Sequence, residues 1–464
     1  MKVAFNNINI TPKNYIGKPL AGYTRKDPCL GKLDDIFAYG VLIDGSSSKD
    51  YSDFLLLISV DILKLPLSIT KYIKAKIKYN HPSIKEEQII IHATHTHASF
   101  DLTGEFYWPG GKINVIRGIM FGANRNDKYI IWFTNRIVKM VNELFNNLVL
   151  CKFSWKKKEF NPNLIFNRRH PERNTIPDLG VIVFKNMEAN RIIGCIINYA
   201  CHPTTLSYLN NKLSADYPGR IYHRVTELTN GEMKVIYFNG PSGDLNPVTT
   251  YGSDSDQDSG RNQMYDQLGT YEHTKKIGCA IAEEVLKLVN SISDKEFYNS
   301  MKVKILSKEF WIPMKDARYF SKKWFTNKLV QAIKKLLLLN VAKYQLVNSN
   351  FPIFQFKYRF INYKCKTIIQ YVIIQAKSNL SEKRLSILTV PGELFESIGN
   401  KLFKKSVTTS KNTFIFQNAQ DWIAYLFTLQ EYIEEGGYEV TPSFSPLCGY
   451  YVEREMLNLM KESN

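Results

Sequence analysis

The stretch Ile89-Ile90-Ile91-His92-Ala93-Thr94-His95-Thr96-His97 joins an apolar run to three histidines, and it decides how the sequence is interpreted. The β-branched run predicts a strand over residues 88–93. Because side chains of an extended strand alternate between faces, we expect His95 and His97 to point the same way. Two imidazoles on one face at the end of a buried strand are half of a metal site. The alternative is a surface pair on an edge strand, but three of the 8 histidines fall here, which favours a metal site.

Outward from this strand, apolar strands and helices alternate from the N-terminus to about residue 300. Further strands are expected at residues 37–43, 54–60, 180–184, 192–199 and 234–238. Apolar residues recur at helical spacing over residues 127–150 and 268–289. This alternation predicts an α/β fold whose sheets are largely buried.

Residues 301–380 are poorer in glycine and rich in lysine and aromatic residues, and we expect a divergent helical insertion there. Within it, residues 322–347 form a candidate amphipathic helix. One interpretation is a core helix with solvated lysines, and the other is a cap over the site that contacts an acyl chain. From Leu385 onward the pattern returns to strand and loop, so we expect a single domain over residues 1–464.

The 464 residues carry a net charge of +18 that is spread along the whole chain. Such a surface favours anionic substrates or membranes, but no nucleic-acid-binding motif is visible. We therefore expect a small-molecule partner and no nucleic acid, and leave peripheral membrane contact and oligomeric state open. The seven cysteines are odd in number and scattered, as is typical of free thiols in a reducing compartment. With no signal-peptide core and no apolar run of ~18 residues, the sequence predicts a cytoplasmic protein.

Polar residues follow three further strand-like runs. His202 comes after the run 196–201, the turn 240–247 comes after the run 235–238, and Glu393 comes after the run 385–390. In α/β sheets such loops gather at one edge and build the site. Taken singly, His202 could be a satisfied buried histidine and Glu393 a carboxylate at a helix N-terminus. Together with His95, however, they are a typical set of ligands for catalytic zinc.

These segments resemble the catalytic domain of the neutral/alkaline (non-lysosomal) ceramidases, a family of zinc-dependent amidases. The motifs that carry the resemblance are, in chain order, Ala93-Thr94-His95-Thr96-His97, Phe166-Asn167-Arg168-Arg169-His170-Pro171, Asn198-Tyr199-Ala200-Cys201-His202-Pro203-Thr204, Leu213-Ser214-Ala215-Asp216-Tyr217-Pro218-Gly219, Val390-Pro391-Gly392-Glu393, Tyr425 with Gln430-Glu431-Tyr432, and Gly437-Tyr438-Glu439. They cover roughly residues 10–300 and 385–440. The resemblance implies two mixed β-sheets sandwiched between helix layers.

The resemblance also implies a role for individual residues. Zinc would be held by four ligands: His95, His202, Glu393 and Tyr425. The groups that act on or bind the substrate would be His97, Arg168, Tyr438 and, from the turn, Gly243 and Asp244. Zinc makes hydroxide available at neutral pH. Arg168 would stabilise the developing oxyanion, and His97 would exchange a proton with the leaving amine.

Two features depart from the family. The family's hexapeptide Gly-Asp-Val-Ser-Pro-Asn carries a proposed serine nucleophile, whereas this chain has Gly243-Asp244-Leu245-Asn246-Pro247. An amide cannot act as an alkoxide, so Asn246 is at most a hydrogen-bonding group. We also expect this protein to lack the family's signal peptide and C-terminal immunoglobulin-like domain. We therefore predict a zinc-dependent hydrolase of lipid metabolism that cleaves a linear N-acyl amide other than ceramide through a metal-activated water. The alternatives are an esterase or other metallohydrolase and an inactive ligand-binding relative.

Overall fold

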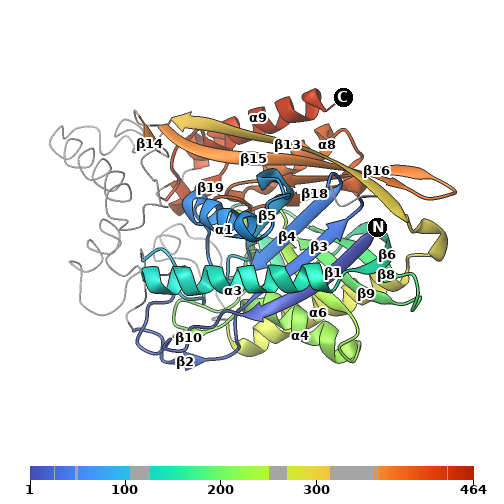
Figure 1. The fold of residues 1–464 in the computed structure, drawn as a ribbon. Coiled ribbons are helices and arrows are strands. Elements are labelled where there is room, and N and C mark those ends of the chain that lie inside the picture. Colours follow the sequence, from blue (N-terminus) through green and yellow to red (C-terminus); the bar gives the residue numbers. More distant parts are fainter. Residues whose placement is uncertain are drawn as a thin grey trace.

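The computed structural model describes residues 1–23, 25, 27–46, 51–104, 126–249, 269–313, 360–361, 364–435, 437–440 and 442–463. The candidate helix at residues 322–347 lies outside these ranges. Figure 1 shows two sheets with helices on their outer sides. The expected α/β class and its layered arrangement are thus confirmed.

The first sheet has eight strands in the order β11-β9-β8-β6-β1-β3-β4-β5. Their bounds are β1 Lys2–Asn9, β3 Phe37–Asp44, β4 Phe54–Val60, β5 Ile89–Ala93, β6 Val149–Glu159, β8 Asp178–Asn186, β9 Ile192–Tyr199 and β11 Lys234–Asn239. The pairs β4–β5 and β9–β11 are parallel and the others antiparallel, so the sheet is mixed. All residues of β4 and β5 are buried, as their continuous apolar runs predict.

This sheet curls until its two ends meet. The hydroxyl of Ser59 in β4 donates a 2.7 Å hydrogen bond to the carbonyl of Tyr237 in β11, although five strands lie between β4 and β11 in the sheet order. His92 in β5 lies 3.2 Å from the amide of Asn239 in β11. Side-chain hydrogen bonds therefore join strands that no backbone ladder connects, and the loops that follow β5 and β9 come together.

The second sheet has the order β13-β15-β16-β18. Its strands are β13 Ser300–Pro313, β15 Lys364–Lys377, β16 Glu382–Thr389 and β18 Thr413–Phe416, and β14 Phe360–Ile361 pairs with β15. We expected a helical insertion at residues 301–380. This expectation is wrong at both ends of the segment, because residues 301–313 and 364–377 belong to the strands β13 and β15, which pair along their whole length. Lys302 and Lys304 alternate with Met301 and Val303 at the period of two that belongs to a strand.

Helices cover both sheets (Figure 1). The first sheet carries α1 Leu67–Asn80, α3 Asp127–Asn146, α4 Asp216–Leu228 and α6 Tyr271–Asn290, and the second carries α8 Glu396–Lys405 and α9 Cys448–Glu462. Helix α3 ends four residues before the predicted 150, because Val149 and Leu150 begin β6. The largest core cluster joins the two sheets, for example through Ile197 and Ile387, and fully burying such side chains stabilises the fold by about 1.5–3 kcal/mol each.

Short elements connect these layers and carry much of the site. The two-stranded ribbons are β2 Gly31–Lys32 with β10 Lys212–Leu213, β7 Ile165–Asn167 with β12 Leu245–Pro247, and β17 Glu393–Leu394 with β19 Tyr425–Leu426. The short helical turns are η1 Glu86–Gln88, η3 Asp294–Glu296, η7 Ser410–Asn412, the π-helical η8 Glu431–Glu435 and η9 Tyr438–Val440.

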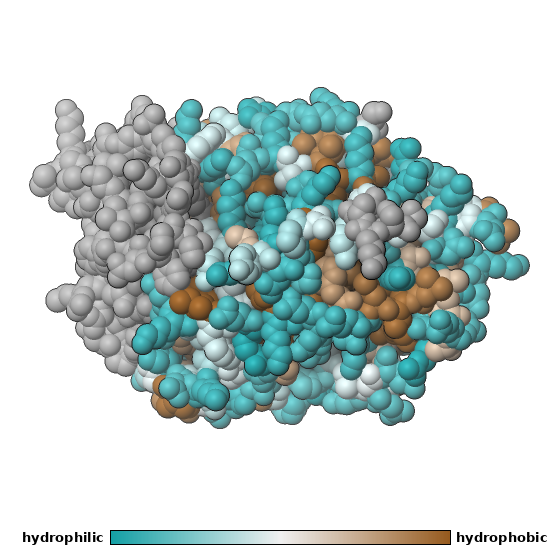
Figure 2. Space-filling view, viewed as in Figure 1, coloured by the Kyte–Doolittle hydropathy of each residue, from teal (hydrophilic) through white to brown (hydrophobic). Residues whose placement is uncertain are grey.

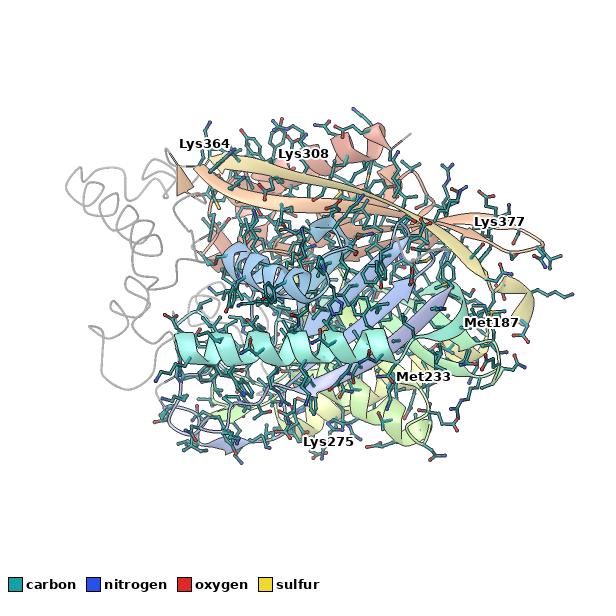
Figure 3. The ribbon with its side chains drawn as sticks, in the orientation of Figure 1. Met187, Met233, Lys275, Lys308, Lys364 and Lys377 are labelled. Carbon is teal, nitrogen blue, oxygen red and sulfur yellow. The ribbon has the colours of Figure 1, made fainter. Side chains whose placement is uncertain are left out.

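The surface is largely hydrophilic, with an apolar area at the right of Figure 2 where Met187 is labelled in Figure 3. Labelled lysines lie at opposite ends of the molecule, Lys275 at the bottom and Lys364 at the top (Figure 3), so the positive charge is distributed. Among the described residues, no helix is long and apolar enough to cross a membrane. All seven cysteines are described, and none of them forms a disulfide bond.

Candidate metal centre

Three imidazoles converge where the loops after β5 and β9 meet. The ring nitrogens of His95, His97 and His202 that face one another lie within 4.8 Å. The ring centroids of His95 and His202 are 4.7 Å apart. His95 and His202 are almost completely buried and His97 is half-buried. The structure thus brings together the three histidines that the sequence singled out.

The backbone reason for this convergence differs from the one expected. Strand β5 ends at Ala93, and His95 has a left-handed φ of +68°. His95 and His97 therefore meet through a turn and not through strand alternation, so that part of the interpretation is wrong. A left-handed non-glycine residue costs about 1–2 kcal/mol. The cost is offset locally, because the amide of His95 donates to the carbonyl of Ile62 at 2.9 Å.

In His95 and His202, a hydrogen bond to a backbone carbonyl determines which ring nitrogen is available to bind a metal. Nδ1 of His95 lies 2.7 Å from the carbonyl of Leu63, and Nδ1 of His202 lies 2.9 Å from the carbonyl of Ser242. A carbonyl only accepts hydrogen bonds, so each Nδ1 carries the proton and each Nε2 presents a lone pair. This is how metal-binding histidines are commonly oriented.

Both lone pairs face one carboxylate oxygen. Oε2 of Glu393 lies 3.3 Å from Nε2 of His95 and 3.4 Å from Nε2 of His202. Burial alone would raise the pKa of Glu393, but the two histidines and Arg168 offset it and lower the pKa to about 2. Burial also lowers the pKa of His202 to about 3. At neutral pH Glu393 is ionised and His202 is neutral.

The Nε2 atoms of two histidines and one carboxylate oxygen thus converge on a common point. Within the described residues, Oε2 of Glu393 has no hydrogen-bond donor. A buried carboxylate oxygen without a partner is costly, and a cation bound between these three atoms removes that cost. Two neutral imidazoles and a carboxylate are ligands that zinc prefers. The residues present therefore fit a divalent metal ion.

Two aromatic residues flank Glu393. The indole N–H of Trp422 donates to Oε1 of Glu393 at 3.0 Å, which turns Oε2 toward the histidines. Strand β17 pairs in parallel with β19, with Glu393 opposite Tyr425. Side chains of directly opposed residues lie on the same face of a ribbon, so the ladder places Tyr425 beside Glu393. The sequence motif contained Tyr425 but gave no reason to choose Trp422.

His97 lies at the side of this centre. Neither of its ring nitrogens has a hydrogen-bond partner within the described part of the chain. Burial and the neighbouring positive groups lower the pKa of His97 well below its usual value, so it is neutral. Gly22 has a φ of +97° and a Cβ there would lie 2.5 Å from the imidazole of His97, so only glycine fits. The ring of Tyr23 packs against His97 with centroids 4.7 Å apart.

A second group of predicted residues surrounds Arg168. Its Nη1 donates to Oδ1 of Asn246 at 2.8 Å, and its Nη2 donates to the carbonyl of Gly243. The guanidinium lies 5.4 Å from the ring centre of Tyr425. Asp244 has a different environment: its carboxylate accepts from the side chain of Asn167 and from the amide of Glu396, each at 2.8 Å. Burial raises the pKa of Asp244 to about 7.

Tyr438 begins η9, but its side chain lies outside the described part of the structure. The next residue, Glu439, is buried and paired with Arg168. The sequence motif contained Glu439 without indicating a role, because a lone glutamate in a polar segment has no distinctive signal.

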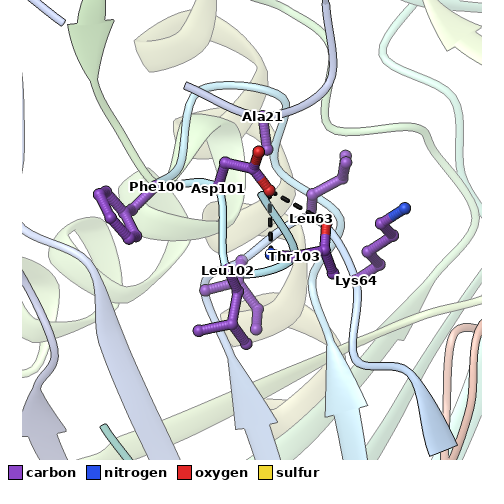
Figure 4. A pocket seen from close by; sticks show the side chains of 8 residues that line it. Ala21, Leu63, Lys64, Phe100, Asp101, Leu102 and Thr103 are labelled. Carbon is purple, nitrogen blue, oxygen red and sulfur yellow. Dashed lines mark hydrogen bonds between the residues drawn. The ribbon is translucent and has the colours of Figure 1, made fainter. Parts of the chain in front are cut away.

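A small pocket (Figure 4) lies next to Leu63, whose carbonyl accepts from Nδ1 of His95. Apolar and polar side chains line it together: Ala21, Ile62, Leu63, Lys64, Phe100, Asp101, Leu102 and Thr103. Its interior has no room for a molecule the size of water, so the pocket by itself identifies no ligand.

Comparisons with known proteins place the fold. No protein-family model matches the chain, and no curated protein matches it in sequence. The crystal structure of neutral ceramidase from Pseudomonas aeruginosa superimposes with a TM-score of 0.69 at 13% identity, covering 99% of this chain and 74% of that one. A structure described as ceramidase complexed with C2 gives the same score and identity, covering 100% of this chain and 75% of that one. The fold that the sequence motifs implied is therefore confirmed.

Proposed function

We propose that this protein is a metal-dependent hydrolase that cleaves a linear N-acyl amide. The observation that carries the proposal is the convergence of two imidazole lone pairs on one ionised carboxylate oxygen, at 3.3 and 3.4 Å. A satisfied core histidine would have a donor or acceptor at each ring nitrogen. The shared fold with ceramidase structures supports the same interpretation.

The metal would be held by His95, His202, Glu393 and Tyr425. This donor set suits several divalent metals, and we propose zinc because the sequence motifs resemble those of zinc-dependent amidases. When bound, a divalent cation supplies Lewis acidity toward the amide carbonyl and the attacking water. The chain's own residues do the rest.

Arg168 is placed to stabilise the oxyanion that develops on the amide carbonyl, because its guanidinium is always charged. His97 is neutral and has free ring nitrogens, so it would accept a proton from water and deliver it to the leaving amine. Asn246 is not a nucleophile, since its side-chain oxygen accepts from Arg168. In Asn246→Ala we therefore expect much of the activity to remain, and complete loss with the metal still bound would contradict attack by water.

We further propose that the substrate is a lipid-like N-acyl amide other than ceramide, in a reducing compartment such as the cytoplasm. The fold shared with ceramidase structures supports a lipid amide as the substrate class. The seven cysteines, none in a disulfide bond and six of them buried, support a reducing compartment.

The deciding experiment is metal analysis of purified protein by plasma mass spectrometry, for wild type and Glu393→Ala. We expect about one zinc ion per wild-type chain and a clear loss in the variant. Absence of metal from the wild type after zinc reconstitution would overturn the proposal and favour a ligand-binding protein. Binding would then be sought as thermal stabilisation by N-acyl compounds.

A further inference from the structure

Glu439 connects two arginines at the edge of the candidate site. Oε1 accepts from Nε of Arg168 at 3.0 Å, and Oε2 accepts from Nη1 of Arg169 at 3.1 Å. The side chain of Glu439 is 3% exposed, and those of Arg168 and Arg169 are 11% and 4% exposed. One buried carboxylate thus accepts hydrogen bonds from two guanidinium groups.

The contacts of Arg168 are directional. Its Nε, Nη1 and Nη2 each have a different acceptor, in Glu439, Asn246 and Gly243. A free arginine side chain has several rotatable bonds, whereas these three contacts fix the plane and the position of the guanidinium. Of the three acceptors, only Glu439 is charged.

The backbone near Glu439 is built for this pairing. Gly437 has a φ of +93°, which favours glycine. A Cβ at position 437 would lie 2.3 Å from Nη1 of Arg169 and 2.5 Å from Oε2 of Glu439. Any side chain at this position would therefore push into the ion pair.

We propose that Glu439 is a positioning residue that holds Arg168 where it stabilises the oxyanion of the amide substrate. This inference rests on the proposed function, and it extends that function to a residue that does not touch the substrate. Glu439 acts by orienting Arg168, and its contact with Arg169 holds the carboxylate itself in place.

The test compares Glu439→Gln with a matched control, Glu455→Gln, in metal-loaded full-length protein. Glu455 is also a buried glutamate with two basic partners, Lys308 at 2.7 Å and Arg454, but it lies on α9. The probe is N-dodecanoyl-7-amino-4-methylcoumarin, with kcat, KM, thermal midpoint and metal content measured for each protein. In Glu439→Gln we expect kcat to fall by about 100-fold with KM changed by less than about threefold, because the contact acts in the transition state.

Glu455→Gln should lose stability without this loss of kcat. Unchanged kcat in Glu439→Gln, or a loss that matches the folded fraction in both variants, would overturn the proposal. If Glu439→Gln does not fold, Gly437→Ala provides the second variant, because it displaces the ion pair and keeps both charges. It should lower kcat in the same direction, and full activity in a folded Gly437→Ala would contradict the role of Glu439.

A structural readout separates this proposal from the proposed function. If the wild type does not hydrolyse the probe, the amidase proposal fails on that substrate, and crystal structures of wild type and Glu439→Gln decide the positioning role. Loss of the contacts of Arg168 with Asn246 and Gly243 in the variant would support it. Retention of both contacts would overturn it.

Discussion

His92 and His95 are three residues apart, yet their surroundings are opposite. The hydroxyl of Ser59 donates to the carbonyl of Tyr237, so it accepts from Nδ1 of His92 at 2.9 Å. Nε2 of His92 lies 3.0 Å from Oδ1 of Asn239 and 3.2 Å from its backbone nitrogen. Both ring nitrogens of His92 thus have a hydrogen-bonding neighbour, whereas Nε2 of His95 faces Oε2 of Glu393, which has no hydrogen-bond donor in the described part of the chain. The difference distinguishes a structural histidine from a ligand.

The largest effect is expected from His95→Ala, which removes a ligand from the metal centre. We expect the metal to be lost and turnover of N-acyl amides to fall by about 10⁴-fold or more, since chemistry at the centre depends on the cation. Metal analysis and kinetics on the same preparation check this. A variant that keeps its metal and its activity would show that His95 is a structural histidine, as His92 is, and not a metal ligand.

His97→Gln should separate metal binding from proton transfer. Because His97 is outside the set proposed to hold the metal, we expect metal content to stay near the wild-type value while kcat falls by about 10²–10⁴-fold. A matching loss of metal would show that His97 is itself a ligand, which the proximity of the three histidine rings permits.

His92→Phe tests the structural side of the comparison. The substitution keeps the ring volume but leaves the amide of Asn239 without its acceptor in a fully buried place. We expect the free energy of unfolding to fall by about 1–3 kcal/mol, with metal content per folded chain unchanged. Denaturant unfolding measures the first quantity, and selective loss of metal would contradict a purely structural role.

The smallest effect concerns acid stability. Burial lowers the pKa of both His92 and His202 to about 3, from an ordinary value of 6.5. The unfolded chain therefore binds more protons between these values, so stability is present above pH 6.5 and is lost as the pH falls toward 3. In His92→Phe one of these contributions is absent, and the metal-free variant should show a shallower loss of stability over that range. An equal slope for both proteins would exclude His92 as a source of acid sensitivity.

Much of the fold was predictable because its signals are local. The apolar runs of β4, β9 and β11 and the helical spacing of α3 and α6 gave those elements within a few residues. The error at residues 301–313 and 364–377 has a simple cause: lysines that alternate with apolar residues suit a strand with one solvated face as well as a helix. A local pattern of this kind does not report which neighbours a segment will have.

The sequence by itself determined which residues stand at the ends of buried strands, including His95, His202 and Glu393. Only the tertiary structure decided that they meet. His95 follows β5, the edge strand of the first sheet, and His202 follows β9, which lies near the opposite edge of that sheet. Glu393 follows β16 of the second sheet. The curl of the first sheet and the left-handed turn at His95 bring them within hydrogen-bonding range of one another. The pairing of Arg168 with Glu439 spans 271 positions in the chain. Such contacts depend on long-range packing, because the free energy that fixes them comes from burial shared between segments and not from any one segment.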